Sequence, residues 1–168
     1  MAGLRTAIQE LLTLIETSSV KFARVFNNQF QYMEDGSIES FPMPCVFVEA
    51  LLPNDNAGLG ATVTDVTFRI HIGMNELDAQ DGTLEQNVNI FALRDEMVAL
   101  LTYKMLSGCS GLQKVSESMD YTHTNVYHYV LEFVCSFVDV AGDQTVTQEE
   151  TTPPTVLETT IDIVTSIT

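Results

Sequence analysis

Residues 125–140 carry the pattern that most limits how this chain can fold, because apolar or aromatic side chains recur there at every second position. The odd positions are all of this kind: Tyr127, Tyr129, Leu131, Phe133, Cys135 and Phe137. The even positions are mixed: Val126, His128, Val130, Glu132, Val134 and Ser136. Such alternation, rich in β-branched and aromatic residues, predicts a long strand. One face of this strand should be all core, and the other should be half-buried and need a partial cover.

Two amphipathic stretches predict helices. Residues 2–16 place their apolar side chains on one helical face. Residues 84–106 carry a wide apolar stripe, which indicates broad packing against a sheet, and Ser107 with Gly108 is expected to end this helix.

Alternating or continuous apolar runs predict the strands. Residues 20–26 and 29–33 are expected to form a hairpin around Asn27 and Asn28. Residues 45–52 and 62–75 read as two further strands, and the polar stretch 109–119 should pair antiparallel with 125–140. We therefore expect an α+β fold with a mixed or antiparallel sheet of about four to six strands and two main helices on one face.

The composition changes after residue 140, so the chain is expected to have two parts. Residues 1–140 should form one α+β domain, and residues 141–168 an acidic, Thr-rich, extended C-terminal arm without Lys or Arg. The arm has strand-like composition, with Val156, Ile161 and Ile163 among threonines, and it could add a strand to the sheet edge of a neighbouring subunit. A disordered tail is the alternative for this arm.

The net charge limits the possible partners. Seven Lys and Arg stand against 23 Asp and Glu, giving −16 at pH 7. This balance argues against sequence-specific or phosphate-based binding of nucleic acid and against an anionic membrane surface. Cys45, Cys109 and Cys135 show no paired spacing, so we expect buried, reduced thiols in a chain made in a reducing cytoplasm.

Metal binding is not expected from the positions of the three histidines. His71 and His128 fall on predicted strands and His123 in a turn, and by parity His123 and His128 lie on opposite faces. His123 and His128 could therefore bind the same zinc or iron ion only if the strand contained a bulge.

No catalytic or cofactor motif stands out either. A nucleophilic pair of Cys135 with His71 or His128 is conceivable, but Cys135 falls on the core face and the histidines on the other. Residues 57–61 lack the spacing of a phosphate-binding loop, and residues 78–81 lack the calcium-loop series. We expect no enzyme, no cofactor and no metal. A small hydrolase using Cys135 or a histidine stays as a third alternative.

The order of these segments resembles a known family. A helix is followed by Pro42-Met-Pro-Cys-Val-Phe-Val-Glu49, then by Val66-Thr-Phe-Arg-Ile-His-Ile72, a second helix and a hairpin over 114–133. In this order and pattern, residues 1–140 resemble the tail-terminator and tail-completion proteins at the head–tail junction of tailed phages. The versions from phages or prophages of Bacteroides-like hosts are the most similar. Residues 141–168 extend beyond the usual pattern.

The resemblance implies a structural virion protein without catalytic residues. Such subunits form homo-oligomeric rings, of six copies in long-tailed phages and sometimes twelve in short-tailed ones, between the portal or adaptor and the tail tube. The expected location is the virion, after assembly in the host cytoplasm. Candidate subunit-interface residues are Val126, His128, Val130, Glu132, Val156, Ile161 and Ile163. The alternative is a non-catalytic, monomeric ligand-binding or regulatory domain.

Overall fold

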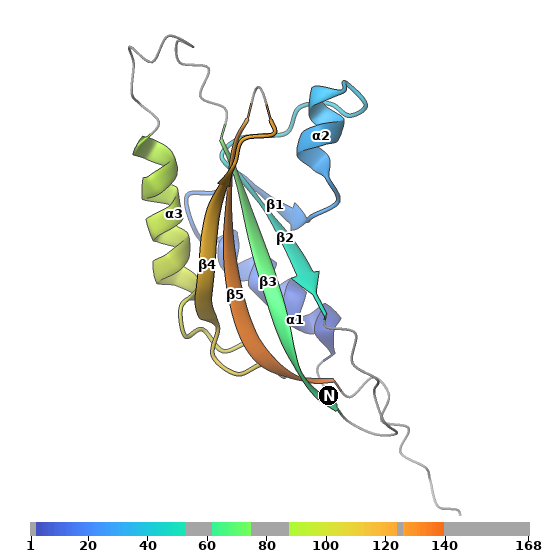
Figure 1. The fold of residues 1–168 in the computed structure, drawn as a ribbon, viewed down its shortest axis with the longest axis vertical. Helices are drawn as coiled ribbons and strands as arrows, with labels where there is room; N and C mark the ends of the chain where they lie inside the picture. Colours follow the sequence, from blue (N-terminus) through green and yellow to red (C-terminus); the bar gives the residue numbers. More distant parts are fainter. Residues whose placement is uncertain (1–2, 53–61, 75–87, 124–125, 140–168) are drawn as a thin grey trace, which may run out of the picture.

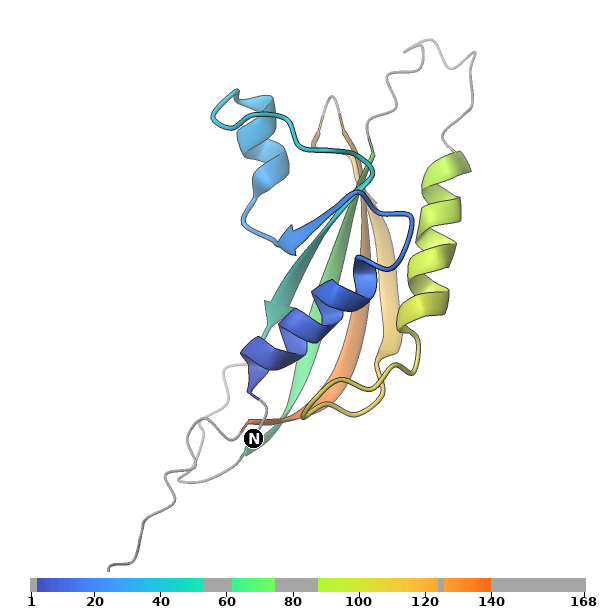
Figure 2. The ribbon, with the colours of Figure 1, turned by 180° about the vertical axis from the view of Figure 1, so that it is seen from behind.

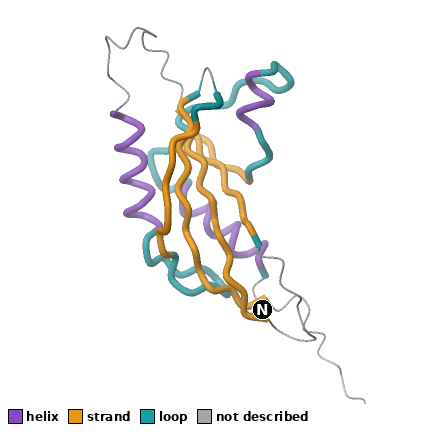
Figure 3. Tube along the Cα trace, viewed as in Figure 1, coloured by secondary structure: helices purple, strands orange, loops and turns teal. Residues whose placement is uncertain are grey.

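The computed structural model describes residues 3–52, 62–74, 88–123 and 126–139 (Figure 1). The expected arm over 141–168 and the expected start of the second helix at residue 84 lie outside these residues. Within these residues the chain forms three helices and five strands, and the five strands make one sheet (Figure 3). In chain order they are α1 (Leu4–Ile15), β1 (Phe22–Val25), α2 (Gln29–Glu34), β2 (Cys45–Leu51), β3 (Thr62–Met74), α3 (Val88–Leu101), β4 (Gln113–Asp120) and β5 (Tyr127–Asp139).

The sheet is mixed, with strand order β1-β2-β3-β5-β4. Its centre is the antiparallel pair of the two longest strands, β3 and β5, which stay in register from Thr62 opposite Asp139 to Met74 opposite Tyr127. β4 pairs antiparallel with β5, as the sequence predicts, and β1 pairs parallel with β2. The expected α+β fold is therefore confirmed, and the stretch 125–140 supplies a central strand of the sheet.

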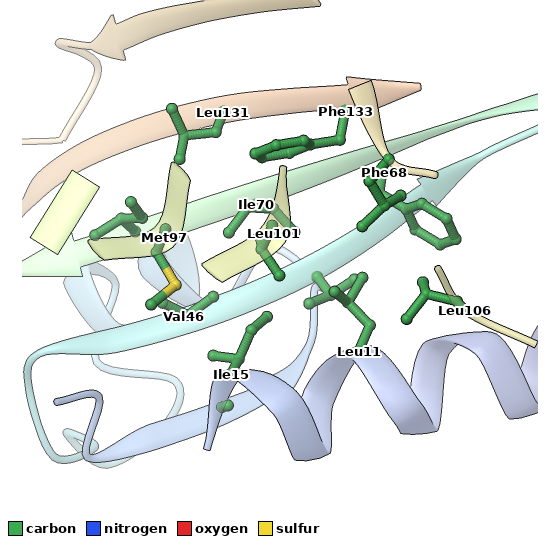
Figure 4. Packing of buried hydrophobic residues seen from close by; sticks show 14 of the residues in the cluster. Leu11, Ile15, Val46, Phe68, Ile70, Met97, Leu101, Leu106, Leu131 and Phe133 are labelled. Carbon is green, nitrogen blue, oxygen red and sulfur yellow. The ribbon is translucent and has the colours of Figure 1, made fainter. Parts of the chain in front are cut away.

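Helices α1 and α3 lie on one face of the sheet, as expected, and Figure 2 shows α1 crossing in front of the strands and α3 alongside the β4 edge. Ala7, Leu11 and Ile15 of α1 are fully buried because their spacing places them on one side of the helix. Figure 4 shows the side chains of this core from both helices and from the strands. The odd positions of β5 point into this core, among them Leu131 and Phe133 with no exposed surface.

The opposite face of the sheet is covered at one end by α2, which the sequence did not predict. Phe30 of α2 is buried against Cys45 and Phe47 of β2 and against Val126. The expected hairpin over 20–26 and 29–33 is wrong, because residues 29–34 form a helix and β1 pairs parallel with β2. Asn28, with φ at 56°, makes the change of direction between them.

The second predicted helix ends earlier than expected, at Leu101 rather than near residue 106. Tyr103 takes a left-handed φ of 60°, which ends the helical path. The chain then folds back, and the backbone N–H of Tyr103 donates to the carbonyl of Leu112 at 2.7 Å. Gly108, with a positive φ of 77°, therefore lies in this returning loop and does not end the helix.

Candidate functional site

The chain's three histidines lie together at the end of the sheet that α2 covers. His71 comes from β3, His128 from β5, and His123 from the connection between β4 and β5. The ring centroids of His71 and His123 lie 5.1 Å and 5.2 Å from that of His128. All three rings face the side of the sheet opposite α1 and α3, where Figure 1 shows α2 beside the end of the β4–β5 pair.

A chain of short polar contacts joins the histidines to three carboxylates. His128 Nε2 lies 2.9 Å from His71 Nδ1, and His71 Nε2 lies 3.3 Å from Glu49 Oε2. On its other side, His128 Nδ1 lies 3.1 Å from Asp120 Oδ2. His123 Nδ1 lies 3.2 Å from Glu34 Oε2, and His123 Nε2 lies 4.0 Å from Asp120 Oδ2.

Aromatic rings cover this network. The ring of Phe26 stacks on His71 with centroids 3.8 Å apart, and the ring of Phe30 lies 4.7 Å from that of His128. The side chains of His71, His123 and His128 keep only 7%, 7% and 3% of their surface exposed. Burying polar groups costs free energy unless they are hydrogen-bonded. The aromatic rings can therefore bury the three histidines only because the polar contacts satisfy the ring nitrogens.

Burial controls the protonation of the two strand histidines. It lowers the pKa of His71 to about 4, and the nearby charge of Arg69 acts in the same direction. It also lowers the pKa of His128 to about 4, with His71 adding to the effect. For Asp120, burial alone would raise the pKa, but hydrogen bonds from Thr122 and the two neighbouring histidines lower it overall. At neutral pH the two imidazoles are thus uncharged beside an ionised Asp120.

The parity argument that separated His123 from His128 is wrong. β5 begins at Tyr127, so His123 lies in the β4–β5 connection and not on the strand where parity applies. The chain turns back there, and ligand atoms of His123, His128 and Asp120 all lie within 4.8 Å of one another. The antiparallel pairing of β4 with β5 could have predicted part of this cluster, because Asp120 is directly opposite His128 in that register.

The predicted interface residues fall into three groups. Val126 and His128 are 5% and 3% exposed beneath the α2 segment, so the chain itself covers this part of the half-buried face. Val130 and Glu132 remain half-buried on the same face, farther along β5. Val156, Ile161 and Ile163 are outside the described residues. The interface itself stays a prediction for these positions.

Glu132 belongs to a second polar cluster on that face. Arg69 Nε donates to Glu132 Oε1 at 2.7 Å, and Ser116 Oγ donates to Glu132 Oε2 at 2.5 Å. These hydrogen bonds, from Ser116 first and Arg69 second, lower the pKa of Glu132. The cluster joins β3, β4 and β5, so Glu132 has a role within the chain.

The arrangement separates Cys135 from the histidines. Cys135 is 2% exposed on the face of α1 and α3, as expected, and burial raises its pKa to about 12. A thiol with such a pKa is not a thiolate at neutral pH and is a poor nucleophile. Cys45 and Cys109 are also buried and free, as predicted.

An open groove of about 500 Å³ lies on the helical side of the molecule, away from the histidines. It runs between α1 and the loop that follows α3, where Thr6, Gln9, Leu14 and Met105 line it.

Comparisons with known proteins add no family. No protein-family model matches the chain, and no curated protein matches it. Within the described residues, no helix is both long enough and apolar enough to cross a membrane.

Proposed function

We propose that this chain is a structural subunit of a homo-oligomeric ring at the head–tail junction of a tailed phage, of the tail-terminator or head–tail joining type. The proposal starts from the resemblance in segment order over residues 1–140. The fold is compatible with the proposal, because the segments in this order form a mixed sheet with two helices on one face. The partners would be further copies of the chain, the portal or adaptor, and the tail-tube proteins, and the location would be the virion.

The observation that carries the proposal is the open part of the sheet. α2 covers only one end of its face, and farther along β5 Val130, Glu132 and Val134 are half-buried while Val138 is 41% exposed. β4 lies at the edge of the sheet with mostly exposed side chains, including Val115 at 57%. An edge strand beside an incompletely covered face favours pairing with another chain.

We propose that a neighbouring copy's C-terminal arm occupies the β4 edge. The 28 residues from 141 to 168 follow β5 almost directly and bring Val156, Ile161 and Ile163 in a β-branched, Thr-rich context. Strand addition gives affinity through main-chain hydrogen bonds, and alternate side chains supply specificity. A ring built in this way needs a strand donor and a complementary edge on each subunit, and the proposal assigns these roles to the arm and to β4.

The charge distribution supports a passive conduit and argues against nucleic-acid binding. Arg69, Arg94 and Lys114 form ion pairs with carboxylates of the same chain, as does the more exposed Arg24. Few basic groups are left to neutralise phosphates on a chain of net charge −16. An acidic channel wall would repel passing DNA, which suits a ring through which a genome travels.

The test is the native mass of the purified full-length chain by light scattering and native mass spectrometry. We expect a closed ring, with six or twelve copies, and we expect the chain in purified particles by mass spectrometry. Ile161→Asp combined with Ile163→Asp should weaken assembly, because two charges replace apolar side chains of the arm. Thr160→Asp combined with Ser166→Asp is the matched control, because it adds the same charge to the other face of the proposed strand and keeps both isoleucines.

A second pair of variants tests the open face. Val138→Asp should weaken assembly without unfolding the chain, since Val138 is already 41% exposed. Met105→Asp makes the same kind of change at a 72% exposed residue on the helical side and should leave the mass unchanged. A monomer at high concentration, together with absence from particles, would contradict the ring and favour the monomeric ligand-binding alternative.

A further inference from the structure

Three side chains at the end of the sheet have the composition and spacing of a metal site. The ligand atoms of Asp120, His123 and His128 all lie within 4.8 Å of one another. Asp120 Oδ2 is 3.1 Å from His128 Nδ1 and 4.0 Å from His123 Nε2. Ligands held at 2.0–2.2 Å in a tetrahedral site lie about 3.3 Å apart, between these two distances. The side chain of His123 would have to move by roughly an ångström to complete this geometry.

The other nitrogen of each histidine already has the partner that a metal-bound imidazole needs. Glu34 Oε2 lies 3.2 Å from His123 Nδ1, which leaves Nε2 of His123 directed toward Asp120. His71 Nδ1 lies 2.9 Å from His128 Nε2, which leaves Nδ1 of His128 directed toward Asp120 as well. Such outer partners fix the ring orientation and the tautomer of metal-binding histidines.

The contacts around the three side chains form one connected network. Four polar contacts of 3.3 Å or less join it: Glu34 to His123, Asp120 to His128, His128 to His71, and His71 to Glu49. Each carboxylate only accepts hydrogen bonds, and each imidazole offers two ring nitrogens. Asp120 Oδ2 lies beside the nitrogen of His128 and the nitrogen of His123 that face away from the outer partners.

A metal ion beside Asp120 would be compatible with all the outer contacts. His123 Nδ1–H would donate to Glu34, His128 Nε2–H would donate to His71 Nδ1, and His71 Nε2–H would donate to Glu49.

We propose that Asp120, His123 and His128 bind one divalent transition-metal ion, with Zn²⁺ as the best-fitting ion. Two imidazole nitrogens and one carboxylate oxygen suit Zn²⁺ and disfavour Ca²⁺ and Mg²⁺, which prefer oxygen ligands. The fourth ligand is a water molecule, since the Asp120 side chain is 32% exposed and opens the site to solvent. The site lies within one folded subunit and does not depend on the proposed ring.

A metal ion at this site would stabilise the packing of α2 against the β4–β5 hairpin, two parts of the chain that are far apart in sequence. Asp120, His123 and His128 belong to the β4–β5 hairpin, while Glu34 is the last residue of α2. An ion there would hold His123 in the orientation in which it bonds Glu34, and thereby hold α2 over the open face. The role is structural, and its expected signature is a higher unfolding temperature with metal.

The experiment uses the tag-free, full-length chain after treatment with a chelator. Zn²⁺ is titrated in competition with a chromogenic chelator, and Co²⁺ is added separately to record its visible absorption. We expect one ion per chain, a Co²⁺ spectrum typical of nitrogen and oxygen ligands, and a rise in unfolding temperature. Excess Mg²⁺ should not displace the ion. His123→Gln and Asp120→Asn should abolish stoichiometric binding, and His71→Gln should weaken it by about 10–100-fold.

Asp95→Asn is the matched control. Asp95 is 69% exposed on α3, so this variant loses the same negative charge as Asp120→Asn at a distant place and should bind normally. Circular dichroism checks that each variant is folded, and His123→Gln is the safest of them because His123 lies in a connection. No Zn²⁺ binding, or several weak ions per chain that His123→Gln leaves unchanged, would overturn the proposal, since an acidic chain attracts cations diffusely.

Discussion

Gly73 of β3 lies against the ring of Phe30 from α2, so that a Cβ atom at position 73 would stand 2.6 Å from Cζ of that ring. Gly73 is also directly opposite His128 in the β3–β5 register. The missing side chain is therefore what lets Phe30 approach the sheet and cover His128. Gly73→Ala should displace α2 and lower the free energy of unfolding by about 1–3 kcal/mol, the usual cost of overpacking. Urea unfolding measures this loss.

A double-mutant cycle with Phe30→Ala checks the cause. Removing the ring should make Gly73→Ala less costly in the Phe30→Ala background, with a coupling free energy of about 1 kcal/mol. Some cost should persist, because Sγ of Cys45 would still lie 2.8 Å from the new Cβ. Additive effects of the two substitutions would show that the Phe30 contact does not explain the requirement for glycine.

The buried thiols should resist labelling in the folded chain. Burial raises the pKa values of Cys45 and Cys135 to about 12, so neither is a thiolate at pH 8. A water-soluble thiol reagent at pH 8 should therefore label the native chain slowly and the urea-unfolded chain rapidly. Ser40→Cys, at an exposed position, is the positive control. Rapid labelling of native Cys135 would instead revive the hydrolase alternative.

Glu132 should stabilise the fold in a pH-dependent way. Hydrogen bonds from Ser116 and Arg69 lower its pKa below the usual value of 4.5, so its contribution is fully present above that pH and is lost as the pH falls through the folded pKa. Glu132→Gln should cost about 0.2–1 kcal/mol at pH 7, because the pair with Arg69 is partly exposed. Thermal unfolding of both proteins from pH 7 to pH 3 should show the difference shrinking; a constant difference would contradict this origin.

Arg94 of α3 should stabilise the contact with the edge strand β4, because its planar guanidinium group binds both oxygens of one carboxylate. Its Nε and Nη2 atoms donate to both carboxylate oxygens of Glu117 on β4, at 2.6–2.8 Å. Arg94→Lys keeps the charge but loses this fork, so we expect a loss of about 0.5–1 kcal/mol that falls at high salt. Arg24→Lys is the control, since Arg24 meets Glu16 by one atom pair at 3.3 Å and both are more than half exposed. Equal losses in urea unfolding would contradict the importance of the fork.

The central strands and first helix were predictable because a single periodicity runs through each. In β5 every odd residue from Tyr129 to Phe137 is buried, as strict alternation requires. In α1 the fully buried Ala7, Leu11 and Ile15 repeat at the helical spacing. Long, regular patterns of this kind leave little freedom in how a segment can bury its apolar side.

The α2 segment and the end of α3 were not predictable in this way. In residues 20–33 the apolar positions fit both a hairpin and a short helix. The helix forms because it lets Phe30 pack against the apolar side chains of β2. Met105 and Leu106 continue the helical stripe of α3, but Leu106 is buried from a returning loop. Local periodicity does not distinguish these cases, because distant partners decide them.

The histidine cluster depended on strand register, which a single sequence does not fix. His71 and His128 are 57 residues apart, and their contact follows from β3 and β5 being neighbours in a particular register. A shift of one residue would move His71 to the helical face. The pairing of Asp120 with His128 was within reach, since both flank a predicted hairpin turn.

The order of the strands has a consequence for how the chain is synthesised. β2 and β3 leave the ribosome long before β5, yet β5 is the strand that fills the space between β3 and β4. Until residue 139 has emerged, β3 has only β2 as a neighbour, and the apolar side chains Phe68, Ile70 and Ile72 lack the strand that completes their core. We expect nascent chains that end before β5 to be sensitive to protease and to need chaperones, and the sheet to close late, as contacts between distant segments generally do.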